Sequence, residues 1–169
     1  MSSTDRNGFT LIELLVVVAI IGIIAAIAVP GLLRARMAGN EASAIGSIRA
    51  ISTAQHAYAQ QCYGFAPVLT ELRAAGNYLS PDLTANAVVA KSGYTVAVMP
   101  GAANLVLATQ GQGCTASGTS YIATAVPLSI GSTGKRAFAT DERGAIWQDT
   151  TGVPPAQPFT VSGTTSVIQ

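Results

Sequence analysis

Residue types that carry out chemistry are scarce in this chain, and they do not form a familiar catalytic set. It has one histidine, His56, and two cysteines, Cys62 and Cys114. A nucleophilic Ser, Thr or Cys needs a neighbouring base, and a zinc site needs several Cys or His ligands. The sequence also lacks a glycine-rich phosphate loop that ends in Lys. We therefore expect no enzyme active site, no cofactor and no metal site.

Three acids lie on or near the sequence DERG at 141–144, which is typical of a tight turn. Asp141, Glu142 and Asp149 would offer carboxylate oxygens to a calcium ion. Calcium takes about six to eight oxygen ligands, so three acids are a thin basis for a site. We favour a solvated turn at this position.

Another acid, Glu13, stands at the start of a long apolar run. Residues 14–33 contain no charged residue, and a helix of about twenty residues spans about 30 Å, the hydrocarbon thickness of a bilayer. A secretory signal has a shorter apolar stretch that ends in a small-residue cleavage site, and this run has no such site. The run therefore predicts a membrane-spanning helix. A carboxylate there costs about 2.5 to 3.5 kcal/mol on insertion scales, so Glu13 needs a functional reason.

Residues 8–16, with the sequence GFTLIELLV, closely resemble the class III cleavage motif of type IV prepilins. Type IV pilins share this motif with the pseudopilins of type II secretion. The resemblance implies that a membrane prepilin peptidase cuts between Gly8 and Phe9 and methylates the new amine of Phe9. Residues 1–8 are then a leader peptide.

The position of Glu13 agrees with that interpretation, because cleavage creates an amine at Phe9, four residues earlier. Opposite charges attract strongly in apolar surroundings, whereas either charge alone is expensive to bury. The resemblance implies that the more important partner is the amine of a neighbouring subunit, and that the pair sets axial register during assembly. Glu13 then supplies specificity more than strength.

The orientation of the helix follows from the resemblance alone. Arg34 and Arg36 lie beyond the apolar run, whereas Arg6 in the leader is offset by Asp5. A positive-inside count would place the body of the protein in the cytoplasm. We follow the resemblance, which places the body outside.

Gly22 and Pro30 interrupt the apolar run. Both residues are ordinary in membrane helices, although a proline removes a backbone hydrogen bond and predicts a bend or local melting. The resemblance implies that these two positions flank a stretch that loses helicity in the filament and makes the fibre compliant.

We expect one long helix over residues 9–62, transmembrane in its first half. In its second half, apolar residues are separated by three or four positions, or by sums of three and four, which predicts one apolar face. These residues are Ile45, Ile48, Ile51, Tyr58 and Cys62. His56 is expected to be solvated or packed on this helix.

Residues 63–169 are expected to form a β-rich head with a C-terminal tail. A short helix is predicted at 69–75, Pro81 in a loop, and strands at 94–99, 104–109, 120–126, 136–140 and 145–148. Four or five antiparallel strands packed on the helix give an α+β fold, which resembles the pilin fold. Residues 150–169 are interpreted as a mobile tail or an edge covering.

The two cysteines allow one intramolecular disulfide, Cys62 to Cys114, which an extracytoplasmic head would favour. Closing this loop contributes roughly 4 kcal/mol on the chain-entropy model. Two separate thiols are the alternative. Pilins commonly enclose a C-terminal loop with their disulfide, so a bridge that starts on the helix departs from the family pattern.

These features predict a structural subunit of a type IV pilus-like filament, for adhesion, motility or DNA uptake. The alternative is a pseudopilin of type II secretion, and a membrane-tethered enzyme is a remote one. The expected partners are other copies of the chain or minor pilins, the prepilin peptidase, an inner-membrane assembly platform and membrane lipid. The subunit is expected in the inner membrane before assembly, and in the periplasm and a cell-surface filament afterwards. A net charge of +1 gives no basic field for nucleic acid.

Overall fold

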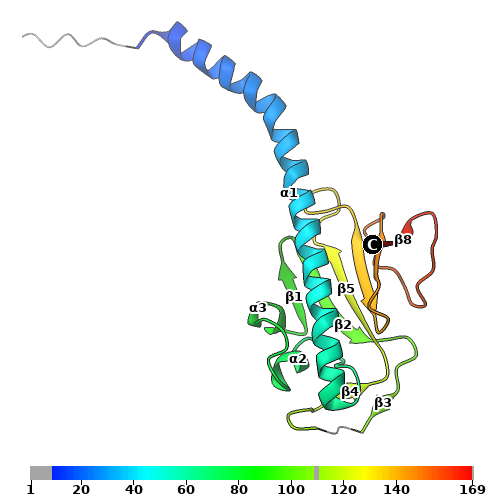
Figure 1. Ribbon diagram of the computed structural model, residues 1–169. Helices are drawn as coiled ribbons and strands as arrows, with labels where there is room; N and C mark the ends of the chain where they lie inside the picture. Colours follow the sequence, from blue (N-terminus) through cyan, green and yellow to red (C-terminus); the bar gives the residue numbers. More distant parts are fainter. Residues whose placement is uncertain (1–8, 109–110, 169) are drawn as a thin grey trace, which may run out of the picture. The chain divides into compact units, whose positions relative to one another are not determined.

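The computed structural model describes residues 9–108 and 111–168 of the chain (Figure 1). The expected leader, including Gly8, lies outside the described residues. The chain divides into two units, one up to Arg36 and one from Met37 onward, and helix α1 contributes to both. The helices are α1 (Leu11–Cys62), α2 (Glu71–Ala74) and α3 (Pro81–Thr84).

The second half of α1 is amphipathic, as its apolar spacing predicts. Ile48, Ile51, Tyr58 and Cys62 have no exposed surface, and they lie on one face of the helix. Ile45 is only partly buried and packs against this core from the side. The buried face lies against the sheet of the head (Figure 1).

The head contains one antiparallel sheet of six strands in the order β1-β2-β5-β6-β7-β8, and β3 pairs with β4 in a separate small sheet. The strands are β1 (Val88–Lys91), β2 (Tyr94–Pro100), β3 (Val106–Leu107), β4 (Ser117–Gly118), β5 (Tyr121–Pro127), β6 (Ala137–Asp141), β7 (Ile146–Asp149) and β8 (Thr165–Ile168). The α+β arrangement of a long helix on an antiparallel sheet is confirmed.

Alternate residues of the central strands fill the core. Val96 and Val98 of β2 and Ala123 and Ala125 of β5 are buried in one cluster with α1. Successive side chains of a strand point to opposite faces of the sheet, so this alternation fixes which face meets the helix. All five residues of β6 are buried, so this strand is covered on both faces.

The predicted strands at 94–99, 120–126, 136–140 and 145–148 correspond to β2, β5, β6 and β7. Of the predicted strand at 104–109, residue 109 lies outside the described residues, and among 104–108 only Val106–Leu107 form a strand, which pairs with β4 outside the main sheet. The predicted helix at 69–75 shortens to α2. Pro81 was wrongly placed in a loop: it opens α3, where the fixed φ of a proline suits the first helical turn.

Both edge strands were missed. β1 joins β2 through Ser92 and Gly93, which have φ values of 48° and 74°. Positive φ at both central residues is typical of a type I′ hairpin turn, so Ser-Gly between two apolar runs was the available signal. At the other edge, β8 pairs with β7 and makes part of the C-terminal segment an edge covering.

Candidate functional site

The apolar first half of α1 is exposed along its whole length within the described unit. From Phe9 to Arg36 every residue is exposed, with values of 81% for Leu11 and 78% for Ile27. Among the described residues, α1 is the helix that is long and apolar enough to cross a membrane. Such a surface is not stable in water, so it must be covered by lipid or by other apolar helices.

Glu13 is held at the beginning of this helix by Thr10. The backbone N–H of Thr10 and its hydroxyl donate to Glu13 Oε2 at 2.9 and 2.6 Å. In return, the N–H of Glu13 lies 3.4 Å from Thr10 Oγ1. This reciprocal arrangement is a capping box, which satisfies N–H groups that have no partner inside the helix. The Thr-x-x-Glu spacing is the sequence signal for such a box, and this role of Thr10 was missed.

The capping box uses only one of the two carboxylate oxygens. Oε1 of Glu13 has no hydrogen-bond partner among the described residues. A carboxylate has about four acceptor sites, so Glu13 can cap its own helix and still accept from another group. Phe9, at the predicted cleavage junction, is 78% exposed beside it.

Helix α1 continues without interruption through Gly22 and Pro30. The predicted local melting is therefore absent from this structure. A Cβ added at Gly22 would meet no atom within 4 Å, so packing inside the chain gives no reason for a glycine there. Loss of helicity on assembly stays a prediction.

The far end of α1 is fastened to the head by a disulfide between Cys62 and Cys114, with a Cα–Cα distance of 5.8 Å. Gln61 adds hydrogen bonds beside it. Its Nε2 donates to the carbonyls of Ala75 and Gln112 at 3.1 and 2.6 Å, and its Oε1 accepts from the Tyr78 hydroxyl. One side chain therefore joins α1, the α2 region and the loop that carries Cys114.

The three acids considered for calcium are not brought together. Asp141 and Asp149 lie at opposite ends of the β6–β7 hairpin, because Asp149 pairs with Ala137 at the start of β6. Hydroxyl groups of threonines at 151, 164 and 165 bind the Asp149 carboxylate. The hydrogen bonds from Thr151 and Thr165 lower the pKa of Asp149 to about 2. No group of three metal-ligating side chains occurs among the described residues.

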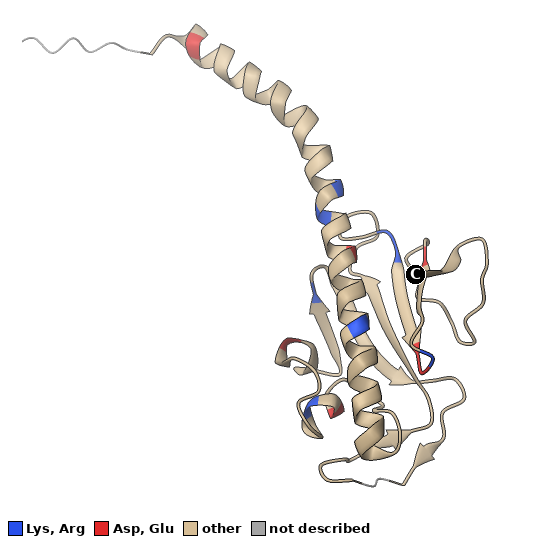
Figure 2. Cartoon of the chain, viewed as in Figure 1, with Lys and Arg blue, Asp and Glu red and all other residues tan. Residues whose placement is uncertain are grey.

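Charged residues occur at both ends of β6 (Figure 2). Near its beginning, Arg136 forms an ion pair with Glu41 of α1, with Nη2 2.6 Å from Oε2.

His56 is exposed, and its ring lies 6.1 Å from that of Phe65.

Comparisons with known proteins agree with the N-terminal geometry. Residues 3–29 match the family model described as the prokaryotic N-terminal methylation motif. Over 53 residues the chain is 45% identical to the type IV major pilin protein PilA of Myxococcus xanthus (strain DK1622). This match covers 31% of the present chain and 24% of that protein, so the chain spans about a quarter of the relative's length. No solved structure matches the chain.

Proposed function

We propose that this chain, which is type IV prepilin-like in its N-terminal segment, is a structural subunit of a type IV pilus-like filament. The observation that carries the proposal is the exposed apolar stretch from Phe9 through the first half of α1, which contains Glu13 as its single charged residue before Arg34. Parallel copies of such a helix can cover one another's apolar surface when they leave the membrane. We propose a pilus and keep a secretion pseudopilus as the alternative, because the matched relative is a type IV major pilin but pseudopilins share the N-terminal motif.

Assembly in this proposal begins with cleavage between Gly8 and Phe9 by a prepilin peptidase, followed by methylation of the Phe9 amine. Oε1 of Glu13, which the capping box leaves without a partner, accepts from the Phe9 amine of the next subunit. A subunit in the wrong axial register buries both charges unpaired. Residues 1–8 are the leader, residues 9–62 the assembly helix, and residues 63–169 the head, which lies in the periplasm and then on the cell surface.

The partners follow from the same scheme. Membrane lipid covers the apolar half of α1 before assembly, an inner-membrane platform adds subunits, and other copies or minor pilins cover it afterwards. Gly22 and Pro30 are proposed as the positions that let the helix yield in the filament.

Two substitutions at Glu13 test the pairing separately from the cap. Glu13→Ala removes both roles, whereas Glu13→Gln keeps a side chain that can complete a capping box but carries no charge. An unpaired buried charge costs about 3 to 5 kcal/mol, so each addition to the filament should be disfavoured by at least about a hundredfold. Both variants should therefore fail to assemble.

The measurement is an immunoblot of membranes and sheared filaments, with mass spectrometry of the N-terminus. Both variants should be cleaved to a methylated Phe9, retained in membranes and missing from filaments. Normal filament yield from Glu13→Gln would refute the charge pairing. Wild-type protein that keeps Met1, or begins anywhere beyond Phe9, would refute the prepilin assignment altogether. If processed wild-type protein gives no filaments that can be sheared from the surface, a pseudopilus is favoured instead.

A further inference from the structure

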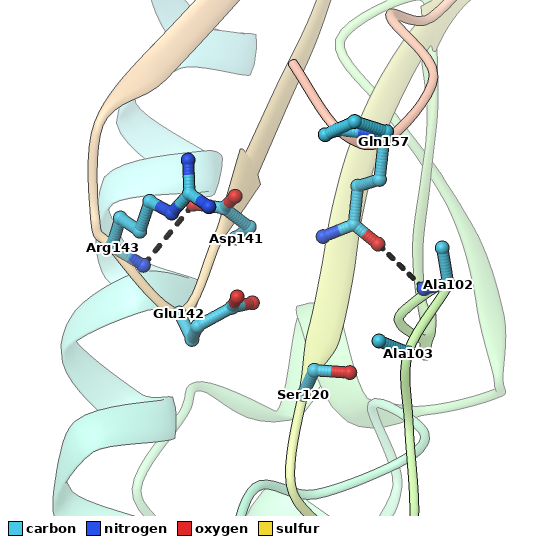
Figure 3. A pocket seen from close by; sticks show the side chains of 8 residues that line it. Ala102, Ala103, Ser120, Asp141, Glu142, Arg143 and Gln157 are labelled. Carbon is cyan, nitrogen blue, oxygen red and sulfur yellow. Dashed lines mark hydrogen bonds between the residues drawn. The ribbon is translucent and has the colours of Figure 1, made fainter.

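A cavity of about 270 Å³ lies at the β6–β7 turn of the head (Figure 3). The methyl groups of Ala102 and Ala103 and the ring of Pro158 supply apolar wall, and Glu142 and Ser120 supply oxygen atoms. Gln157 makes one wall rigid, because its Oε1 accepts from Ala102 N at 2.8 Å and its Nε2 donates to Tyr121 O at 3.2 Å. We propose that this cavity receives the Lys135 side chain of a second copy of the chain, an inference that rests on the proposed filament.

The first argument is the carboxylate of Glu142, which forms no ion pair among the described residues although Arg143 lines the same cavity. Glu142 is only partly exposed, and its Oε2 is enclosed by protein without a hydrogen-bond partner among the described residues. The ion pairs of the described residues are Lys91 with Asp82 and Arg136 with Glu41, so neither involves Glu142. A partly desolvated carboxylate without a partner is unfavourable, and a cation in the adjoining cavity would remove that penalty.

The second argument is the shape and chemistry of the cavity. A lysine has a long apolar stem and a compact ammonium group that carries three donors. The stem suits the walls formed by Ala102 and Pro158, and the ammonium suits the carboxylate of Glu142. Ser120 lines the same cavity, and its Oγ also has no hydrogen-bond partner among the described residues.

The third argument identifies the lysine. The chain has two, and Lys91 is already paired with Asp82 at 2.6 Å. Lys135 is exposed, and only its backbone N–H is engaged, by Glu41. It lies just before β6, whereas Glu142 lies just after it. Seven residues of extended chain separate them by about 23 Å, so Lys135 cannot reach the cavity of its own chain.

Opposite charges at opposite ends of one strand suit a head-to-tail contact. Lys135 of one head contacts Glu142 of the next head. The joined pair then still has one free Lys135 and one free Glu142, to which further heads can add. Such heterologous contacts build open fibres when they do not close into a ring. One contact is weak, but it is repeated at each subunit and acts together with packing of the α1 helices.

Cross-linking of sheared wild-type filaments with a water-soluble carbodiimide tests the contact directly. This reagent joins a carboxylate to an amine in contact with it, so we expect a peptide that links Glu142 to Lys135. Because about 23 Å separates these residues within one chain, the link must join two copies. Filaments that give other cross-links but not this one would overturn the proposal.

Charge exchange provides the second test. Lys135→Glu and Glu142→Lys should each lower filament yield by about tenfold or more, since each leaves a charge beside a like charge. The double variant Lys135→Glu/Glu142→Lys should restore assembly, whereas Lys91→Glu is the matched control that leaves the contact intact. Retention of the Cys62–Cys114 disulfide and of normal membrane levels shows that each head has folded. Normal yield from both single variants, or no recovery in the double, would overturn the proposal. Absence of filaments from the wild type would refute the proposed function instead.

Discussion

Glu41 connects α1 to the sheet, and its removal should destabilise the head measurably. Glu41 is 8% exposed, and its carboxylate accepts from the backbone N–H groups of Lys135 and Arg136 at 2.9 and 3.3 Å. Arg136 Nε and Nη2 donate to it at 2.9 and 2.6 Å. Breaking a fully buried pair costs about 3 to 5 kcal/mol. The Arg136 side chain is 38% exposed and can turn into water, so we expect about 2 kcal/mol for Glu41→Ala.

The assay is urea unfolding of the full chain in detergent, followed by the fluorescence of Trp147, the only tryptophan. Trp147 pairs with Ala139 of β6, so it reports on the strand that follows Arg136. With a slope of about 2 kcal/mol per molar urea, the midpoint should fall by about 1 M. Asp82→Ala is the matched control, because the Lys91–Asp82 pair has the same 2.6 Å distance but both side chains are about a third or more exposed. It should leave the midpoint nearly unchanged.

The same pair predicts a pH dependence. Burial by itself would raise the pKa of Glu41, but the N–H of Lys135 and the Arg136 side chain outweigh it and hold the pKa below its ordinary value of 4.5. The stabilisation is therefore complete above pH 4.5 and is lost as the pH falls through the lower folded-state pKa. The difference between wild type and Glu41→Ala should shrink below that pH. Equal midpoint shifts for Glu41→Ala and Asp82→Ala, or a difference that persists after protonation, would refute this reasoning.

Three further changes probe the rest of the head. Cys62→Ser should lower head stability by up to about 4 kcal/mol but leave membrane insertion intact; peptide mapping that finds free thiols at Cys62 and Cys114 in wild-type filaments would contradict it. Gln55→Ala should cost about 2 kcal/mol in the urea assay, because the buried amide exchanges two hydrogen bonds with Ala66. Asp149→Asn should speed amide exchange in β8 but not in β5, since the carboxylate holds that segment. In the wild type β8 should stay protected until the pH falls from about 4 towards 2, the folded-state pKa of Asp149. Unchanged exchange in β8 would rule out this anchoring role.

Local sequence signals predicted the parts of the structure that depend on near neighbours. The spacing of Ile48, Ile51 and Tyr58 identified the buried face of α1, because the helical period brings such residues to one side whatever the rest of the chain does. The uncharged run before Arg34 likewise predicted a membrane-length helix from length and composition alone. Two cysteines permit one connectivity, and the structure has that disulfide.

Contacts between distant residues could be found only in the tertiary structure. The edge strand β8 carries no such local signal and becomes a strand by pairing with β7, whereas β1 had the Ser92-Gly93 turn as its local signal. Glu41 and Arg136 are 95 positions apart, so neither reveals the other in the sequence. The cavity beside Glu142 is formed by four separate segments of the chain. Periodicity fixes a helix locally, whereas the partner of a buried charge and the walls of a cavity depend on how the whole chain packs.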